Sequence, residues 1–270
     1  GETGYTRAGP EAGRLVSRPL VSLRAVHKRF GDNEVLRGVD LDVDEGCITV
    51  VIGPSGCGKS VLVKHVIGLL RPDSGSIVVD GEDIVPMGEA RLTEVRRKFG
   101  MLFQQSALFD SMTVLENVIF PLVEHRRMSV RQMRELALTR LEQLGLHEVE
   151  RKFPSELSGG MRKRVGLARA TILDPKIVIY DEPMTGLDPI MCENVEDMIL
   201  TAQRELHVTS LVVSHDMAST FRMADRIAML FDGRIRVQGS PREVQASADE
   251  MVRRFIYLSG TGPLEAEAAG

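Results

Sequence analysis

The stretch Gly53-Pro54-Ser55-Gly56-Cys57-Gly58-Lys59-Ser60 decides the fold of this chain, because it matches the phosphate-loop pattern G-x-x-x-x-G-K-[ST]. It directly follows the apolar, β-branched run Ile48–Ile52, which is typical of a strand buried on both faces. Behind it, apolar residues recur at helical spacing at Val61, Leu62, Val66 and Leu69. A strand, a glycine loop and a helix in this order predict a bound nucleotide rather than a turn that only joins strand to helix.

The loop also predicts how the nucleotide is held. Glycines allow successive backbone N–H groups to converge on a phosphate, and the start of the helix adds roughly half a positive charge. Lys59 is placed to reach the β- and γ-phosphates, and Ser60 is placed to hold Mg²⁺. The predicted nucleotide contacts are the loop residues and the one that follows: Gly53, Pro54, Ser55, Gly56, Cys57, Gly58, Lys59, Ser60 and Val61.

A second chemical feature is the acidic pair Asp181-Glu182, which ends another buried-strand pattern at residues 176–180. Asp174-Pro175 stops the preceding helix, so the strand runs directly into the pair. At the carboxyl end of such a strand, Asp181 can hold Mg²⁺ through water and Glu182 can polarise the attacking water as a general base. The alternative is an acidic pair that is merely solvated.

At Leu157-Ser158-Gly159-Gly160-Met161 the chain resembles the ATP-binding-cassette (ABC) ATPases. Ser158 can cap the helix that begins here. In that family, positions matching Ser158, Gly159 and Gly160 bind the γ-phosphate of the ATP held by another cassette. Because the chain carries one glycine loop and one such signature, the resemblance implies ATP as the nucleotide and a homodimer as the working unit. Alone, the segment also fits a Ser-Gly-Gly loop before the basic residues 162–164.

Four further positions match the family pattern one by one. Gln104 matches the glutamine that contacts Mg²⁺ and the attacking water. Asp188 matches an aspartate that lies across the cassette interface, and His215 matches the histidine that grips the γ-phosphate. Phe30, 23 residues before Gly53, matches the aromatic ring that stacks on adenine, a position usually occupied by Tyr.

The resemblance covers about residues 21–240 and implies the P-loop ABC ATPase fold. This is an α/β fold with a parallel-sheet nucleotide core, a small antiparallel β-subdomain and an inserted helical subdomain at about residues 105–165. Residues 1–20 are expected to form a flexible N-terminal tail, and residues 241–270 a C-terminal extension. The implied catalytic residues are Glu182, His215 and Gln104. The implied metal contacts are Ser60, Gln104 and Asp181.

Local patterns agree with this division. Val21-Leu23-Ala25 and Val39-Leu41-Val43 alternate with polar residues, as half-exposed antiparallel strands do, and Asp80-Gly81 predicts a turn after a strand at residues 77–79. A capping box of Ser129 with Gln132 predicts the start of an amphipathic helix that ends at Gly145. The expected elements further along are strands at residues 177–180, 210–213 and 227–230, with helices at 195–206 and 218–224.

Composition agrees with a globular cassette. The chain has 270 residues, of which 43% are hydrophobic and 27% charged, as in ordinary soluble domains. Its net charge of −4 argues against a nucleic-acid partner. No run approaches the roughly 18 apolar residues of a membrane span, and residues 1–19 do not resemble a secretory signal. The three cysteines, Cys47, Cys57 and Cys192, are odd in number and widely spaced, which fits a reducing cytosol.

Weaker markers narrow the resemblance to the ATPases of the Mla/Mce lipid-transport systems. Met161 stands where Gln is common in the signature, and residues 102–125, 252–256 and Gly262-Pro263 are also similar. This implies an integral membrane permease, a membrane-anchored MCE lipid-carrying protein and a peripheral location at the cytoplasmic face of the inner membrane. Neutral variation in the ATPase of a small-solute importer, such as one for amino acids, is the alternative. The sequence leaves open the lipid, the transport direction and whether a small regulatory subunit binds.

The predicted contact with the permease is a groove around residues 104–124. Phe103, Leu108, Phe109 and Met112 are apolar in a segment where a loop would otherwise be polar, so they are candidates to accept a short permease helix. The alternative is that they only pack the helical subdomain.

Overall fold

The computed structural model describes residues 19–104, 106–125 and 128–258. The predicted N-terminal tail and Gly262-Pro263 therefore lie outside the described residues, apart from the last two positions of the tail. Those two, Pro19 and Leu20, already belong to the first strand, where Leu20 is buried. Within the described part, every helix is too short or too polar to cross a bilayer.

The centre of the molecule is a sheet of six strands in the order β10-β9-β3-β8-β7-β6. Its strands are β3 (Ile48–Ile52), β6 (Phe99–Leu102), β7 (Ile177–Asp181), β8 (Thr209–Ser214), β9 (Arg226–Phe231) and β10 (Arg234–Gly239). All neighbours are parallel except β10, which runs antiparallel to β9. Parallel strands end at one edge of a sheet, so the residues after β3, β6, β7 and β8 collect there. The predicted α/β class and parallel core are confirmed.

A second sheet, in the order β2-β1-β4-β5, is antiparallel. Its strands are β1 (Pro19–Phe30), β2 (Asn33–Asp44), β4 (Ser74–Val79) and β5 (Glu82–Asp83). The alternation predicted for Val39-Leu41-Val43 is confirmed, because all three are buried. The alternation predicted through Ala25 is wrong: Ala25 is exposed with φ 46°, at an irregularity in the pairing, and Val26 is buried instead. An extra residue at a β-bulge shifts the period of two by one.

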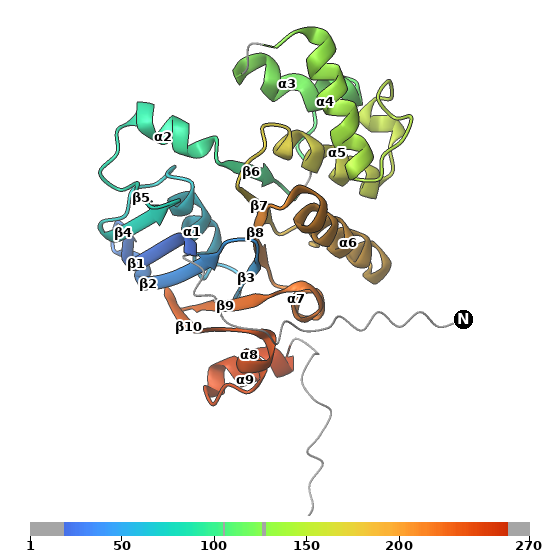
Figure 1. Ribbon diagram of the computed structural model, residues 1–270. Helices are drawn as coiled ribbons and strands as arrows, with labels where there is room; N and C mark the ends of the chain where they lie inside the picture. The colour runs from blue at the N-terminus through green and yellow to red at the C-terminus, as the bar shows by residue number, and fades with distance from the viewer. Residues whose placement is uncertain (1–18, 105, 126–127, 259–270) are drawn as a thin grey trace, which may run out of the picture.

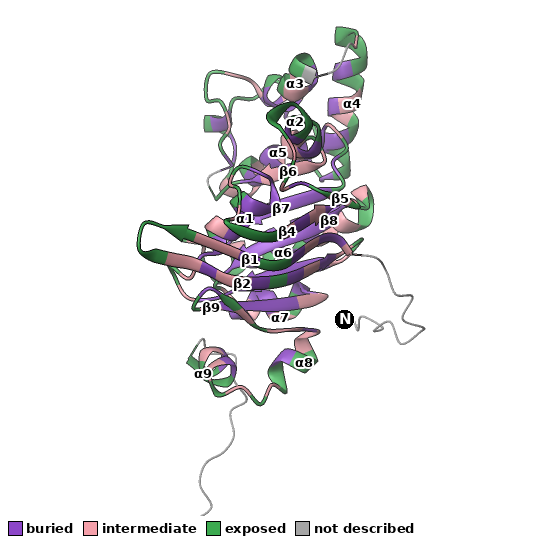
Figure 2. Cartoon of the chain, turned by 90° about the vertical axis from the view of Figure 1, so that its left-hand side faces the viewer, coloured by how far each residue is buried: buried purple, intermediate pink, exposed green. Residues whose placement is uncertain are grey.

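The helices group into a lobe and a set packed around the sheets (Figure 1). The lobe contains α3 (Val114–His125) and α4 (Val130–Gln143), and α5 (Gly159–Thr171) lies between it and the core. The remaining helices are α1 (Lys59–Val66), α2 (Glu89–Arg96), α6 (Pro189–Leu206), α7 (Met217–Met223), α8 (Pro241–Gln245) and α9 (Glu250–Leu258). Figure 2 shows the central strands buried and the outer helices exposed on one side. The predicted capping box of Ser129 with Gln132 is confirmed at the start of α4.

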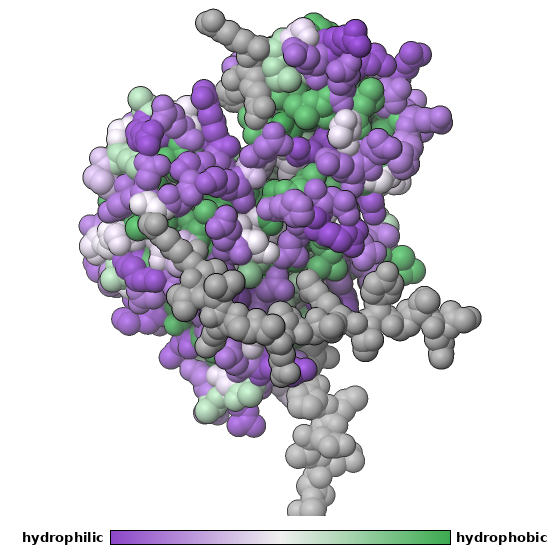
Figure 3. All heavy atoms as spheres, in the orientation of Figure 1, coloured by the Kyte–Doolittle hydropathy of each residue, from purple (hydrophilic) through white to green (hydrophobic). Residues whose placement is uncertain are grey.

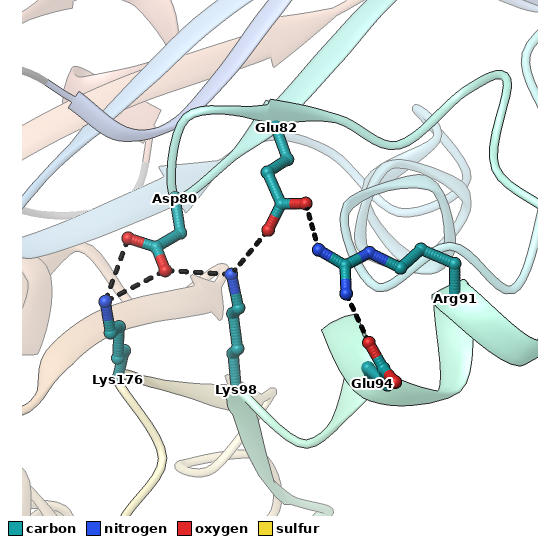
Figure 4. Close-up of polar contacts among 6 residues, drawn as sticks. All are labelled: Asp80, Glu82, Arg91, Glu94, Lys98 and Lys176. Carbon is teal, nitrogen blue, oxygen red and sulfur yellow. Dashed lines mark hydrogen bonds and ion pairs between the residues drawn. The ribbon is translucent and has the colours of Figure 1, made fainter.

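An ion network joins the two sheets (Figure 4). It lies where β6 and β7 begin, whereas the glycine loop follows the carboxyl end of β3, which runs parallel to both of these strands. Asp80 and Gly81 have φ of 52° and 84°, which confirms the predicted turn between β4 and β5. The Asp80 carboxylate accepts hydrogen bonds from Lys98 and Lys176, the residues immediately before β6 and β7. Both lysines hold the pKa of Asp80 below its ordinary value. The turn between β4 and β5 of the antiparallel sheet is thereby linked to the N-terminal ends of β6 and β7 in the central sheet.

Candidate nucleotide site

The glycine loop lies between β3 and α1, as predicted, and its glycines are required by its shape. Gly53, Gly56 and Gly58 have φ of 155°, 78° and 107°, the region that favours glycine. A Cβ on Gly53 would lie 2.1 Å from the Leu230 carbonyl oxygen, so no larger residue fits there. The loop thus passes close to β9 and ends at the first turn of α1, where unpaired N–H groups are available to an anion.

Lys59 folds back over this loop. Its ammonium donates to the carbonyl oxygens of Gly53 at 2.7 Å and Pro54 at 3.1 Å, and only 8% of the residue is exposed. The same Nζ lies 3.7 Å from the Glu182 Oε1 atom. One lysine therefore joins the phosphate loop to the acidic pair at the end of β7.

Glu182 is the meeting point of the catalytic candidates. Its Oε2 atom lies 2.6 Å from His215 Nδ1 and accepts a hydrogen bond of 3.0 Å from Thr185 Oγ1. The Glu182 backbone has φ 50°, and its N–H donates to the carbonyl oxygen of Val213 at 2.9 Å. A non-glycine residue in the left-handed region is costly, and such residues cluster at functional sites. The strand ends of β7 and β8 thus bring Glu182 and His215, 33 residues apart, into contact.

The residues near the loop fit a magnesium–nucleotide complex. Ser60 is exposed in the first turn of α1, and Asp181 is half-buried at the end of β7. Burial, and then the charge of Glu182, raise the pKa of Asp181, while the Lys59 ammonium opposes this. A hydroxyl, a carboxylate and the amide oxygen of Gln104 are the hard oxygen donors that Mg²⁺ prefers.

Gln104 is exposed just beyond β6, at the rim of an open cleft of about 640 Å³. The cleft lies between the core and the helical lobe, and its lining residues are Phe103, Gln104, Ala107, Leu108, Asp110, Pro154, Arg162 and Asp181. Gln104 and Asp181 therefore face one space, although they come from different strands.

The signature segment is built differently. Ser158 is exposed and caps α5, where its hydroxyl accepts a hydrogen bond of 3.2 Å from the Met161 N–H, which confirms the predicted cap. Asp188 caps α6 in the same way through the Met191 N–H at 3.0 Å. Among the described residues, no hydrogen bond or ion pair joins the Ser158–Gly160 segment to the glycine loop. Within one chain, the two predicted phosphate-binding segments remain separate.

Phe30 lies at the end of β1 and is 46% exposed, with the Lys28 ammonium 5.5 Å from its ring centroid. The hairpin that follows it reaches the glycine loop, because a Cβ on Gly58 would lie 3.1 Å from the Val35 side chain. An exposed ring on this hairpin is compatible with the predicted stacking on adenine.

Sequence reasoning missed two residues of the site. Thr185 was not singled out, although it lies three residues beyond Glu182 in the turn that follows β7. Lys163 entered only as one of the basic residues 162–164 in the alternative interpretation of the signature, yet it is buried, with only 7% of it exposed. The signal was present: Lys163 precedes the buried residues Gly166 and Leu167 by three and four positions, which places all three on one face of α5.

Comparisons with known proteins agree with this geometry. The family model described as "ABC transporter" matches residues 36–185. The chain is 41% identical over 253 residues to a "Probable ribonucleotide transport ATP-binding protein mkl" of Mycobacterium leprae, covering 93% of this chain and 73% of that protein. It is 39% identical over 245 residues to the "Intermembrane phospholipid transport system ATP-binding protein MlaF" of Escherichia coli K12, covering 91% of each.

The fold is similar to that of solved cassettes. A dimeric structure of the ATP-binding cassette MJ0796 in a post-hydrolysis state, bound to ADP and Pi, superposes with a TM-score of 0.71 at 33% sequence identity. The match covers 82% of this chain and 99% of that one. That structure is a dimer, whereas in the single chain described here the two predicted phosphate-binding segments, the glycine loop and Ser158–Gly160, remain separate.

Proposed function

This chain belongs to the ABC transporter family and is an ATP-binding ATPase, and we propose that it works as a homodimer that drives a lipid-moving permease of the Mla/Mce type. The observation that carries the proposal is the placement of Lys59, Glu182 and His215 at one sheet edge, with the Ser158–Gly160 segment held apart from them. One chain contains the loop and the base, and a second chain supplies the signature.

In the proposed mechanism, the glycine loop and the α1 N-terminus hold the phosphates of ATP, and Phe30 stacks on the adenine ring. Ser60, Asp181 and Gln104 would hold Mg²⁺, which neutralises charge on the β- and γ-phosphate oxygens. Glu182 accepts a proton from the attacking water while His215, in contact with it, orients the carboxylate and supports the charge that develops on the γ-phosphate. Lys59 shifts its hydrogen bonds from the loop carbonyls to the phosphates.

Closure of the dimer completes each site. Ser158, Gly159 and Gly160 of one chain present the start of α5 to the γ-phosphate held by the other, and Asp188 lies at the interface. Because each chain is both holder and cap, ATP favours the closed state of the pair and hydrolysis favours the open one. That alternation supplies the conformational work for transport.

The open cleft and its apolar rim are the proposed contact with the permease. Phe103 and Phe109 are 44% and 42% exposed, whereas Leu108 packs partly against the core. Phe120 and Val123 of α3 are exposed as well, and Figure 3 shows hydrophobic residues gathered on the helical lobe. A short amphipathic permease helix would bury this apolar surface and contact the segment after β6 that carries Gln104. The chain would then sit on the cytoplasmic face of the inner membrane as a peripheral subunit.

The names of the relatives point to two cargoes, since one is named for ribonucleotide transport and the other for phospholipid transport. The phospholipid assignment is favoured because the match to MlaF spans 91% of both chains and because of the Met161 signature. The cassette does not bind the cargo, so only its partners can separate the two. The proposed partners are an integral membrane permease and a membrane-anchored MCE lipid-carrying protein, and a small regulatory subunit is one further protein to look for.

The decisive experiment is to tag the chain, extract membranes in mild detergent and identify the co-purifying proteins by mass spectrometry. A permease together with an MCE protein, and ATP hydrolysis that responds to added phospholipid in vesicles, would support lipid transport. A permease with a soluble solute-binding protein, and stimulation by ribonucleosides or amino acids instead, would overturn the lipid proposal and leave the ATPase chemistry unchanged.

A further inference from the structure

Lys163 occupies an unusual position in α5. It is a buried cation, and its ammonium donates to two backbone carbonyl oxygens, that of Pro183 and, at 3.4 Å, that of Gln104. Among the described residues, no carboxylate lies within ion-pair distance of it. A buried charge that lacks an opposite charge costs stability, so the two carbonyl oxygens are the groups that compensate the Lys163 ammonium.

The two acceptors belong to the catalytic edge of the core. Pro183 follows Glu182 directly, and Gln104 follows β6. Lys163 itself is in the first turn and a half of the helix that begins with Gly159 and Gly160. One side chain therefore touches three segments: the signature helix, the segment that carries Gln104 and the segment that carries Glu182.

Close packing brings α5 near enough for this contact. A Cβ on Gly100 of β6 would lie 2.4 Å from the Ala170 carbonyl oxygen, and a Cβ on Gly166 would lie 2.9 Å from Leu102. The helix thus rests directly on β6, between the lobe and the core (Figure 1). Burial lowers the pKa of Lys163, as expected of an ammonium enclosed by this packing.

We propose that Lys163 is a positioning residue for ATP hydrolysis. It holds the backbone in place at Gln104 and at Pro183, next to Glu182, and so links these two segments to the signature helix of the same chain. The inference rests on the proposed function, since it assigns Lys163 to the step that Glu182 catalyses. Because the signature helix caps the ATP of the partner, a movement of α5 on dimer closure is transmitted through Lys163 to the catalytic edge of its own chain.

The chain offers a matched control one residue away. Arg164 is also a cation of α5 that donates to a backbone carbonyl, that of Leu144 at 2.9 Å, but its acceptor lies at the end of α4 and outside the site. Lys163→Met and Arg164→Met each remove one cation and one set of carbonyl contacts from the same helix. Only the first removes contacts to Gln104 and Pro183.

The test measures kcat and KM for ATP in the full chain, below the melting temperature of every variant. We expect Lys163→Met to lower kcat by about 10- to 100-fold with KM within about threefold of wild type, because misplaced groups affect the reaction more than binding. Arg164→Met should keep kcat within about twofold of wild type. Lys163→Arg retains the charge and the donors, so its kcat should be at least about tenfold higher than that of Lys163→Met.

Three results would overturn the proposal: an unchanged kcat in Lys163→Met, an equal loss in Arg164→Met, or equal losses in Lys163→Met and Lys163→Arg. Lys163→Gln, which keeps a neutral donor, replaces Lys163→Met in all comparisons should the methionine variant not fold. Inactivity of the wild-type chain and of Arg164→Met together would instead refute the proposed ATPase function, so the two failures are distinguishable.

Discussion

The glycine-loop edge and the signature end of this chain are both proposed to bind phosphate, but their side chains differ in how far they contact one another. At the first, the groups are engaged with one another: Lys59 reaches Glu182, and Glu182 reaches His215. At the second, Ser158 makes a single cap contact with its own helix and is otherwise exposed. This difference is consistent with the proposal that the first half-site carries the catalytic groups and the second binds the phosphate of an ATP molecule held by another chain.

The largest effect on ATP hydrolysis should come from a change at the glycine-loop edge. Glu182→Gln removes the carboxylate that is proposed to accept the proton, while it keeps the size and hydrogen-bonding capacity of the side chain. We expect kcat to fall by about 10²- to 10⁴-fold with nucleotide affinity retained. Single-turnover hydrolysis and equilibrium binding of ATP, measured on one preparation, separate the two quantities. A nearly unchanged rate would move the general base to another residue.

Mixed dimers test whether the two ends really serve different ATP molecules. Lys59→Ala should lose both binding and turnover, and Ser158→Arg should lose turnover because a bulky side chain blocks the start of α5. When the two variants are mixed equally, up to about a quarter of the wild-type rate should return, since half of randomly formed dimers are mixed and each has one intact site of two. A mixture no more active than its components would contradict composite sites.

A smaller effect distinguishes the two roles proposed for Ser158, which are capping α5 and binding phosphate. Ser129 at the start of α4 is the matched control, because its hydroxyl also accepts a hydrogen bond from the third residue of its helix. Each Ser→Ala change should lower the free energy of unfolding by about 1 kcal/mol. Only Ser158→Ala should also lower kcat, by about tenfold, because it removes the hydrogen bond that we propose Ser158 makes to a charged phosphate. Equal kcat values in the two variants would leave Ser158 with capping alone.

Prediction from sequence succeeded where the signal was local. The glycine loop, the buried strands and the Ser129 and Ser158 caps follow from spacing and residue type within a few positions. It failed at Ala25, where a bulge depends on pairing with distant strands, and at Lys163, whose acceptors lie 59 and 20 residues away. The contact of His215 with Glu182 likewise depends on the order of β7 and β8 in the sheet, which no local pattern contains.

The smallest predicted effect is a pH dependence of the magnesium requirement at the glycine-loop edge. Burial and the neighbouring Glu182 charge raise the pKa of Asp181, so its proton competes with Mg²⁺ at a higher pH than for a free aspartate. The Mg²⁺ concentration that gives half-maximal ATPase activity should therefore rise as the pH falls toward the pKa of Asp181, and the rise should begin at a higher pH than for a free aspartate. At pH values well above the pKa it should be constant. Asp181→Asn is the control, because an amide has no proton to exchange: its magnesium requirement should be higher and independent of pH. A wild-type requirement that stays flat over the same range would mean that Asp181 does not take part in holding the ion.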